Sequence, residues 1–188
     1  IRQAALGDLD GDGDLDAYLA VVASQQVDAA APADRVLLND GRGNFSDSGQ
    51  RLAVHDPPRS ALSQLDHRLR NLLNLLEGNG PDQPGSTAVA LGDLDGDGDL
   101  DAFVANDHPA NGSYPTLLFW NDGTCQFADS GQRLNGTMGA ELATGDLDGD
   151  GDLDVFVSNF NLPNEVWLND GGGQFVDSGL RLGTPQDN

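Results

Sequence analysis

The chain has 188 residues and a formal net charge of −22, from 31 acidic and 9 basic residues, and every basic residue is an arginine. So few cations leave no basic face for nucleic acid or for an anionic membrane surface. No apolar run approaches the roughly 18 residues of a membrane span, so we expect no membrane insertion. The acid is concentrated, because three short runs hold 15 of the aspartates.

The first acidic run belongs to a unit that occurs three times along the chain. The decapeptide GDLDGDGDLD starts at Gly7 and recurs at Gly92 and Gly145, with a short apolar run on each side. Each copy continues to an Asn-Asp-Gly turn between two further apolar runs. The turns begin at Asn39, Asn121 and Asn169. Such a turn predicts a β-hairpin, because Asn and Gly supply the positive φ of tight turns.

Each copy therefore predicts four short antiparallel strands. Tandem four-stranded meanders are typical of β-propeller blades, and neighbouring blades must stack to bury both faces. We expect an all-β, β-propeller-type single domain over residues 1–188, with blades at about 2–54, 86–135 and 139–183. Propellers usually have about four to eight blades. The chain is therefore either part of a longer propeller or a unit that pairs with other chains.

An insertion at about 55–85 separates the first two copies. Asp56, Pro57 and Pro58 give the start signal of a helix within it and Gly78 gives the stop signal. Between them, leucines alternate at spacings of three and four, which predicts a helix with one apolar side. These leucines are Leu62, Leu65, Leu69, Leu72 and Leu76. The helix packs either on its own propeller or against another chain. It shares the side opposite the acidic loops with the variable loops, so we expect partner contacts there.

Each acidic run has the spacing D-x-D-x-D-G-x-x-D, which predicts a calcium site. Calcium takes about six to eight hard oxygen ligands. Alternate carboxylates of a tight loop can supply them, with the backbone carbonyl of the seventh residue and the carboxylate of the ninth closing the shell. Magnesium fits less well, because it keeps several waters. The predicted ligands of the three Ca²⁺ sites are Asp8, Asp10, Asp12, Asp14 and Asp16; Asp93, Asp95, Asp97, Asp99 and Asp101; and Asp146, Asp148, Asp150, Asp152 and Asp154.

Other classes with acidic loops are excluded by residues that the runs lack. An EF-hand or a dockerin needs an acid at the twelfth position, where the three copies have Leu19, Val104 and Val157. A thrombospondin-type array needs paired cysteines, and this chain has one cysteine. No Ser-His-Asp or Cys-His arrangement is evident, and a closed calcium loop lacks the open position of a catalytic metal. We therefore expect a protein that is not an enzyme.

The single cysteine, Cys125, stands where the other two copies have Gly43 and Gly173. We expect this turn to be exposed. One cysteine permits no disulfide within the chain, so Cys125 is either a free surface thiol or half of a bridge between two chains.

The decapeptide and the Asn-Asp-Gly hairpin together resemble the FG-GAP and VCBS repeats, the family of integrin α-subunit propellers and many bacterial surface proteins. The FG and GAP signatures themselves are missing, so the VCBS-like version is the closer match. The resemblance implies a seven-bladed propeller in full-length relatives, with calcium loops on one face and a role in adhesion or scaffolding. Weak calcium sites of the extracellular kind would be empty in the cytosol, so we expect an extracellular or cell-surface protein. Three functions are compatible with it: an adhesion or binding module for a protein or glycan ligand, a structural subunit of a surface layer or filament, and the propeller part of a larger secreted enzyme.

Overall fold

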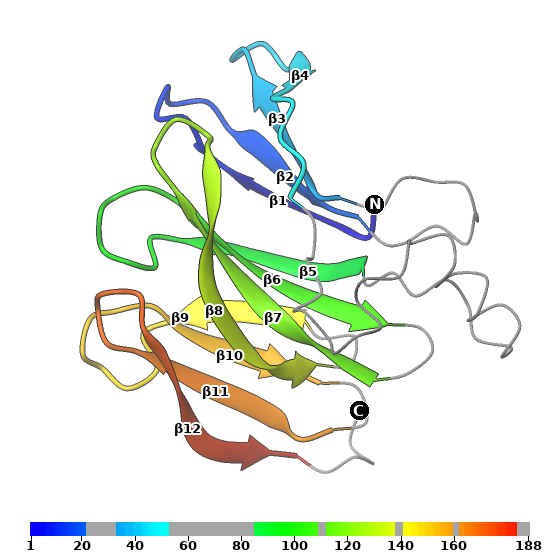
Figure 1. Cartoon of the computed structure of the whole chain (residues 1–188). Helices are drawn as coiled ribbons and strands as arrows, with labels where there is room; N and C mark the ends of the chain where they lie inside the picture. Colours follow the sequence, from blue (N-terminus) through cyan, green and yellow to red (C-terminus); the bar gives the residue numbers. More distant parts are fainter. Residues whose placement is uncertain (22–32, 53–84, 109–111, 138–140, 160–161, 184–188) are drawn as a thin grey trace, which may run out of the picture.

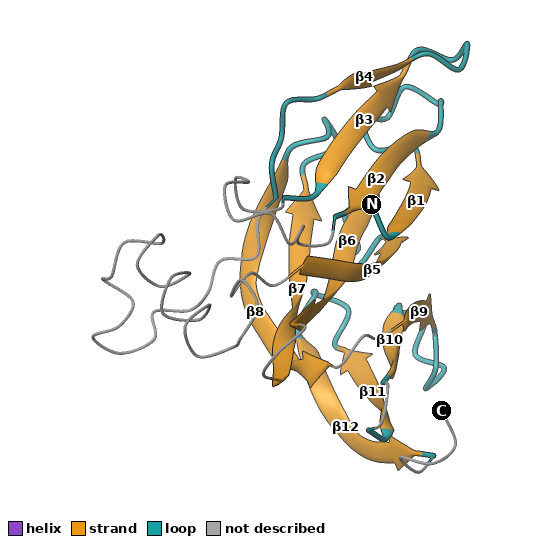
Figure 2. Cartoon of the chain, turned by 90° about the vertical axis from the view of Figure 1, so that its right-hand side faces the viewer, coloured by secondary structure: helices purple, strands orange, loops and turns teal. Residues whose placement is uncertain are grey.

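The computed structural model describes residues 1–21, 33–52, 85–108, 112–137, 141–159 and 162–183. These residues form three four-stranded antiparallel sheets and loops, without a helix (Figure 2). The strands are β1 (Gln3–Gly7), β2 (Asp16–Ala20), β3 (Arg35–Asn39) and β4 (Phe45–Asp47) in the first sheet; β5 (Gly85–Gly92), β6 (Asp101–His108), β7 (Gly112–Asn121) and β8 (Phe127–Thr137) in the second; and β9 (Glu141–Gly145), β10 (Asp154–Ser158), β11 (Asn164–Asn169) and β12 (Phe175–Leu182) in the third. The expected all-β class and the three tandem antiparallel sheets are therefore confirmed.

The predicted helical insertion is not part of this description. The residues from 53 to 84, which include all five leucines of the expected seam, lie outside the described residues. Gly85, at the end of the predicted insertion, already belongs to strand β5. Among the described residues, there is no helix with the length and apolar character needed to cross a membrane.

Pairing within each sheet places the three acidic runs at equivalent positions. Gly7 pairs with Asp16, so the run connects β1 to β2 as a hairpin loop, and the same pairing recurs between Gly92 and Asp101 and between Gly145 and Asp154. All three loops project from the same side of the molecule, on the left in Figure 1. The glycine-to-aspartate register therefore repeats one loop three times.

Turn chemistry at the other hairpins differs in one respect from the expectation. The Asn-Asp-Gly turns connect β3 to β4, β7 to β8 and β11 to β12, as predicted. Positive φ angles, however, fall on Gly41 and Gly43 in the first turn and not on its asparagine. Among the described residues, the one positive φ outside glycine is that of Cys125, at 62°. The turn therefore does not require a positive φ at its asparagine, whose side chain has a different role that is described below.

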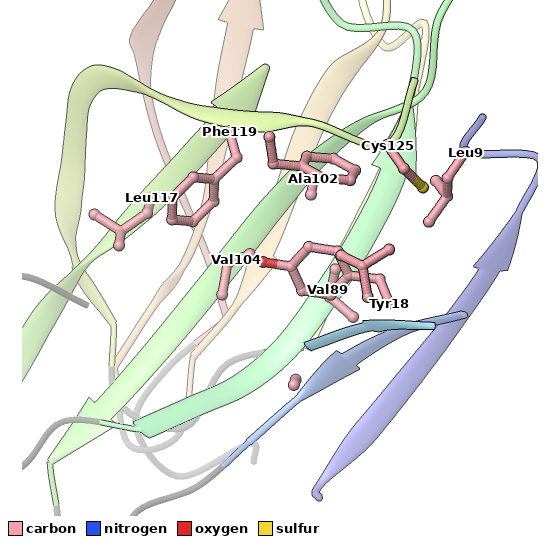
Figure 3. Close-up of a cluster of buried hydrophobic side chains, with 11 residues drawn as sticks. Leu9, Tyr18, Val89, Ala102, Val104, Leu117, Phe119 and Cys125 are labelled. Atoms are coloured by element: carbon pink, nitrogen blue, oxygen red, sulfur yellow. The ribbon is translucent and has the colours of Figure 1, made fainter. Parts of the chain in front are cut away.

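The sheets pack face to face, with their first strands side by side. Strand β1 contacts β5, and β5 contacts β9. Two hydrophobic cores lie between the sheets, one between the first and second and one between the second and third. Figure 3 shows the first core, in which Tyr18 lies beside Val89 and Val104. Successive residues of a strand in the middle sheet enter different cores, as Phe103 and Val104 do. The second sheet is therefore buried on both faces, and this explains its apolar strands.

A buried polar cluster joins the first two sheets at the strand ends remote from the acidic loops. Asp34 is 2% exposed and accepts hydrogen bonds from Val21 N (2.8 Å), Ser86 Oγ (2.8 Å) and Tyr18 Oη (3.3 Å). Burial raises the pKa of Asp34 to about 6, although these three hydrogen bonds oppose the shift. A buried carboxyl that is easier to protonate than in the unfolded chain makes stability depend on pH.

We predict that the free energy of unfolding of Asp34→Asn, taken relative to that of the wild type, increases as pH rises. The folded chain holds the Asp34 proton more tightly than the unfolded chain does. The stabilisation is therefore complete below about pH 4 and is lost as pH rises through about 6. The free energy of unfolding of Asp34→Asn relative to wild type should rise by about 2 kcal/mol between pH 4.5 and pH 7.5 in urea titrations. An unchanged difference between the two pH values would contradict the burial of a titrating carboxyl.

Candidate metal centres

Each acidic loop is wound by its own carboxylates. Asp8 accepts hydrogen bonds from Gly11 N (2.8 Å) and Gly13 N (3.0 Å), and these glycines have φ angles of 75° and 92°. Asp10 accepts from Asp12 N and Asp12 accepts from Asp14 N, at 3.2 and 2.9 Å. The second and third loops repeat these bonds. The alternation of Asp and Gly thus produces a tight loop, because short carboxyl side chains cap the backbone two to five residues ahead.

This winding gathers the first, second and last carboxylates of the run. In each loop, one oxygen from each of three aspartates lies within 4.8 Å of the other two. The triads are Asp8, Asp10 and Asp16; Asp93, Asp95 and Asp101; and Asp146, Asp148 and Asp154. Nine of the fifteen predicted ligands are therefore brought together by the structure, in three groups.

The carboxylates of the other six predicted ligands lie elsewhere in the loops. Asp12 is exposed and its carboxylate caps the loop backbone. The Asp14 carboxylate lies against Gly41 of the neighbouring turn, so closely that a Cβ at Gly41 would collide with it. Asp97 and Asp150 correspond to Asp12, and Asp99 and Asp152 contact Gly123 and Gly171 as Asp14 contacts Gly41. The carboxylate of Asp14 is thus directed to the turn. Its backbone carbonyl remains the predicted ligand.

The last aspartate of each triad is a buried junction. Asp16 is fully buried, and its Oδ2 accepts from Leu9 N (3.0 Å) while its Oδ1 accepts from Asn39 N (2.8 Å). Asp101 and Asp154 make the equivalent bonds. Because a carboxylate oxygen accepts two bonds, each oxygen keeps one lone pair for a cation. The residue therefore links the acidic loop, the Asn-Asp-Gly turn and the triad.

The electrostatics of the triads favour a bound cation. Burial, together with the charges of neighbouring loop carboxylates, raises the pKa of Asp10, Asp95 and Asp148. Burial raises the pKa of Asp101 to about 6. The ion pairs of the described residues use Arg51, Arg133 and Arg181 with acids outside the loops. Since no arginine neutralises the triads there, an external cation would relieve the repulsion.

The donor set fits calcium. Each triad offers carboxylate oxygens alone, with no imidazole or thiolate. Hard oxygen ligands in a flexible loop are what calcium prefers. Metals that favour nitrogen or sulfur, such as zinc and copper, have no suitable ligand in these loops.

A sequence model described as an FG-GAP-like repeat matches residues 93–157 and 146–188, just over half of the chain. The chain belongs to the FG-GAP-like repeat family. The two matches start at Asp93 and Asp146, the first aspartates of the second and third acidic loops. A search of curated proteins finds no match to the chain. The first sheet lies outside the matched residues, yet it repeats the strand order and the triad of the FG-GAP-like repeats that follow it.

The asparagine of each turn has a second role that the sequence signal did not reveal. Asn121 Nδ2 donates to Leu9 O of the first sheet (2.9 Å) and to Leu100 O of its own sheet (3.2 Å). Asn169 Nδ2 connects to Leu94 O and Leu153 O in the same way. The asparagine side chain thus ties the acidic loop of one repeat to that of the next. The sequence signal for this contact is that asparagine recurs at the same position of all three turns, although the turn does not require a positive φ there.

Cys125 is buried, at 1% exposure, so the expectation that the cysteine is exposed is wrong, although Asp122 and Thr124 of the same turn are exposed. Its N–H donates to Leu9 O (3.0 Å), and its side chain enters the core between the first two sheets (Figure 3). The corresponding Gly173 instead donates to Asn169. Stacking of the sheets, which a single repeat does not reveal, covers the cysteine side chain. A buried thiol does not support a bridge between chains.

We predict that neutralising one triad removes one calcium ion. Double substitution of Asp93 and Asp95 by Asn should reduce the calcium stoichiometry from three to two in isothermal titration calorimetry, because amides replace two charged ligands. Asp122→Asn is the matched control, since it removes a charge from the exposed turn of the same sheet. An unchanged stoichiometry in the double variant would refute the triad as a metal centre.

We predict that Cys125 is unreactive in the folded protein. Burial raises the pKa of its thiol to about 12, and loop aspartates including Asp16 add to the shift. The thiolate fraction at pH 8 is then roughly a thousandfold below that of an ordinary cysteine. Labelling with a disulfide-exchange reagent should be slow in calcium buffer and immediate in concentrated urea. Fast labelling of the native protein would contradict the burial.

Proposed function

We propose that this chain is a calcium-binding, β-propeller-type module of an extracellular protein, that it acts in binding or adhesion, and that its calcium ions are structural. The three carboxylate triads carry the proposal. Each triad includes an aspartate that also receives the N–H groups of the loop and of the turn, as Asp101 does from Leu94 and Asn121. A cation bound there would hold both segments in place.

A structural role for the ions agrees with the surroundings of the triads. The first and second of these loops also carry a leucine that is buried under the next sheet, Leu9 in the first loop and Leu94 in the second. Metal binding at such a position stabilises the contact between sheets. The acid–base groups of these loops are the aspartates themselves, and a bound ion would engage them as ligands and so leave them unsuited to proton transfer with a substrate. We therefore propose that the module is not an enzyme.

An extracellular location follows from the affinity expected of such sites. Extracellular calcium modules bind with dissociation constants of about 10⁻⁴–10⁻³ M. Cytosolic calcium would leave these sites empty and the triads unneutralised. Membership of the FG-GAP-like repeat family supports the same location and the propeller-type arrangement of the sheets. We propose a protein or glycan as the ligand, bound on the side opposite the acidic loops.

A second candidate function is that of a structural subunit in an extracellular assembly. One observation favours it: the outer faces of the first and third sheets expose large apolar side chains, among them Phe45 and Leu147. Such side chains on a protein of net charge −22 are suited to contact with another protein surface. The propeller part of a secreted enzyme is the weaker alternative.

We predict that removal of calcium lowers the melting temperature. With free calcium about ten to thirty times above the dissociation constant, each site adds about 1–2 kcal/mol. For three sites in a chain of this length, the melting temperature should fall by roughly 10 to 20 °C in excess chelator. Magnesium should not restore it, whereas calcium should. The variant that lacks the second triad should show about two thirds of the shift. A melting temperature unaffected by chelator would refute a structural role for calcium.

A further inference from the structure

The two joints between neighbouring sheets use the same ring contact. In the first joint, Tyr18 of the first sheet meets Phe127 of the second edge to face, with ring centroids 5.6 Å apart. In the second joint, Phe103 meets Phe175 at 5.4 Å. Tyr18 and Phe103 each lie two residues after the last aspartate of a triad, and Phe127 and Phe175 each begin a fourth strand. Each joint therefore pairs an aromatic residue in the second strand of one sheet with the phenylalanine that begins the fourth strand of the next sheet.

In each joint, both sheets supply a leucine that packs against the other sheet. Leu9 is buried under the second sheet, and Leu94 is buried under the third. In return, Leu100 of the second sheet covers Gly7 of the first, where an added Cβ would lie 2.6 Å from the leucine. The corresponding pair of the second joint is Leu153 and Gly92, at 2.9 Å. The glycines are thus notches that receive a leucine from the following sheet.

The outer faces of the first and third sheets hold the unmatched halves of this joint. The first sheet exposes Leu6, Leu15 and Phe45, the counterparts of Leu91, Leu100 and Phe127. The third sheet exposes Leu147, the counterpart of Leu9 and Leu94, and Leu182, the counterpart of Leu134. These five side chains are between 41% and 60% exposed. No leucine of a following sheet covers Gly145, the notch of the third sheet, among the described residues.

We propose that the outer face of the first sheet docks onto the outer face of the third sheet in a second copy of this chain, with the geometry of the two internal joints. Leu15 of one copy then fills the notch at Gly145 of the other, Leu147 is covered, and Phe45 meets Phe156, the counterpart of Tyr18. The argument is continuity with the two joints already present, since both halves of a third joint are exposed on the same molecule.

Polar groups on the two outer faces also correspond. Asn121 and Asn169 each donate to two leucine carbonyls, one in the preceding sheet and one in their own sheet. Asn39 makes the equivalent bond within its own sheet, to Leu15 O. In the proposed joint Asn39 would reach Leu147 O of the second copy. At the first strands, Gln3 Oε1 accepts from Val89 N of the following sheet (2.8 Å). Its counterpart in the third sheet is Glu141, whose carboxylate is also an acceptor.

One position departs from the internal joints and makes the proposed joint weaker. Gln50 donates to Cys125 O and accepts from Phe127 N, so it clamps the following sheet. Gln132 does the same with Gly173 O and Phe175 N. The third repeat has Leu180 at this position, and its side chain is exposed. The contact between copies would therefore keep the apolar part of the joint and lose the glutamine clamp, as suits an association between separate chains.

Two such contacts between two copies would close a ring. Each copy supplies three sheets, and a two-fold axis pairs each first sheet with the other copy's third sheet. The resulting six sheets lie within the usual range of about four to eight for a propeller. A head-to-tail contact that closes in this way leaves neither outer face exposed. The alternative occupant, further repeats of a longer chain, would leave this chain monomeric.

The test is the solution mass of the full chain in millimolar calcium, measured by sedimentation velocity from about 1 to 200 µM. We expect a species of twice the 19.7 kDa of the chain. Phe45→Asp and Leu147→Asp should each weaken association by about a hundredfold, because each buries a charge in the joint. Leu180→Gln should strengthen association by roughly tenfold, because it restores the clamp. Calcium stoichiometry and circular dichroism report whether each variant is folded.

Val176→Asp is the matched control. Val176 is 64% exposed on the third sheet, and its counterparts Ser46 and Ala128 are exposed in the first and second sheets. The joint leaves this position uncovered, so the variant should associate like the wild type. A wild-type monomer at every concentration would overturn the proposal. So would larger oligomers, or a dimer that both the Phe45 and the Leu147 variants retain.

Mixing the two interface variants distinguishes a head-to-tail joint from any contact between like faces. Phe45→Asp keeps an intact third-sheet face, and Leu147→Asp keeps an intact first-sheet face. A mixture should therefore form a dimer through one unmodified joint, although each variant alone is monomeric. Association in the mixture supports the proposal. Failure of two folded variants to associate when mixed, despite a wild-type dimer, would overturn it.

Discussion

A buried carboxylate in each repeat holds three parts of the structure together. Asp101 accepts one N–H from the acidic loop and one from the Asn-Asp-Gly turn, and it supplies an oxygen to the triad. The turn asparagine Asn121 in turn donates to Leu9 O in the acidic loop of the preceding sheet, and Asn169 of the third repeat donates to Leu94 O in the same way. Loop shape, the candidate metal centre and stacking of the sheets are therefore coupled through a single side chain.

This coupling explains why a charge is tolerated at full burial. An isolated buried carboxylate is costly, and hydrogen bonds to two N–H groups offset part of that cost. The burial that raises the pKa of Asp101 to about 6 shows that a penalty remains. A calcium ion would remove the penalty and neutralise the neighbouring aspartates. The metal centre and the joint between sheets would then stabilise each other.

The three repeats are alike where the joint requires it and differ where a neighbour is different. Cys125 replaces a glycine beside the first joint and fills its core despite a positive φ, a conformation that costs a non-glycine residue about 1 kcal/mol or more. Leu180 replaces the glutamine clamp on the one sheet whose following neighbour is not part of the described chain. Asp34 and Ser86 form a buried polar contact between the first two sheets. Substitutions within the repeat thus record which face each sheet presents to its neighbour.

The local features could be predicted from the sequence because they depend on residues close together in the chain. The acidic loops, the hairpin turns and four strands per repeat follow from Asp, Gly and apolar spacing within about fifty residues. The sequence predicts that the sheets stack, but it does not predict which side chains of different repeats meet, because these contacts join residues far apart in the chain. Only the tertiary structure places Cys125 in a core, directs the Asp14 carboxylate to Gly41 and leaves Leu15 and Leu147 exposed while their counterparts are covered. Burial of this kind is a property of neighbouring sheets, and the same repeat sequence has different surroundings at the middle and at the ends of the stack.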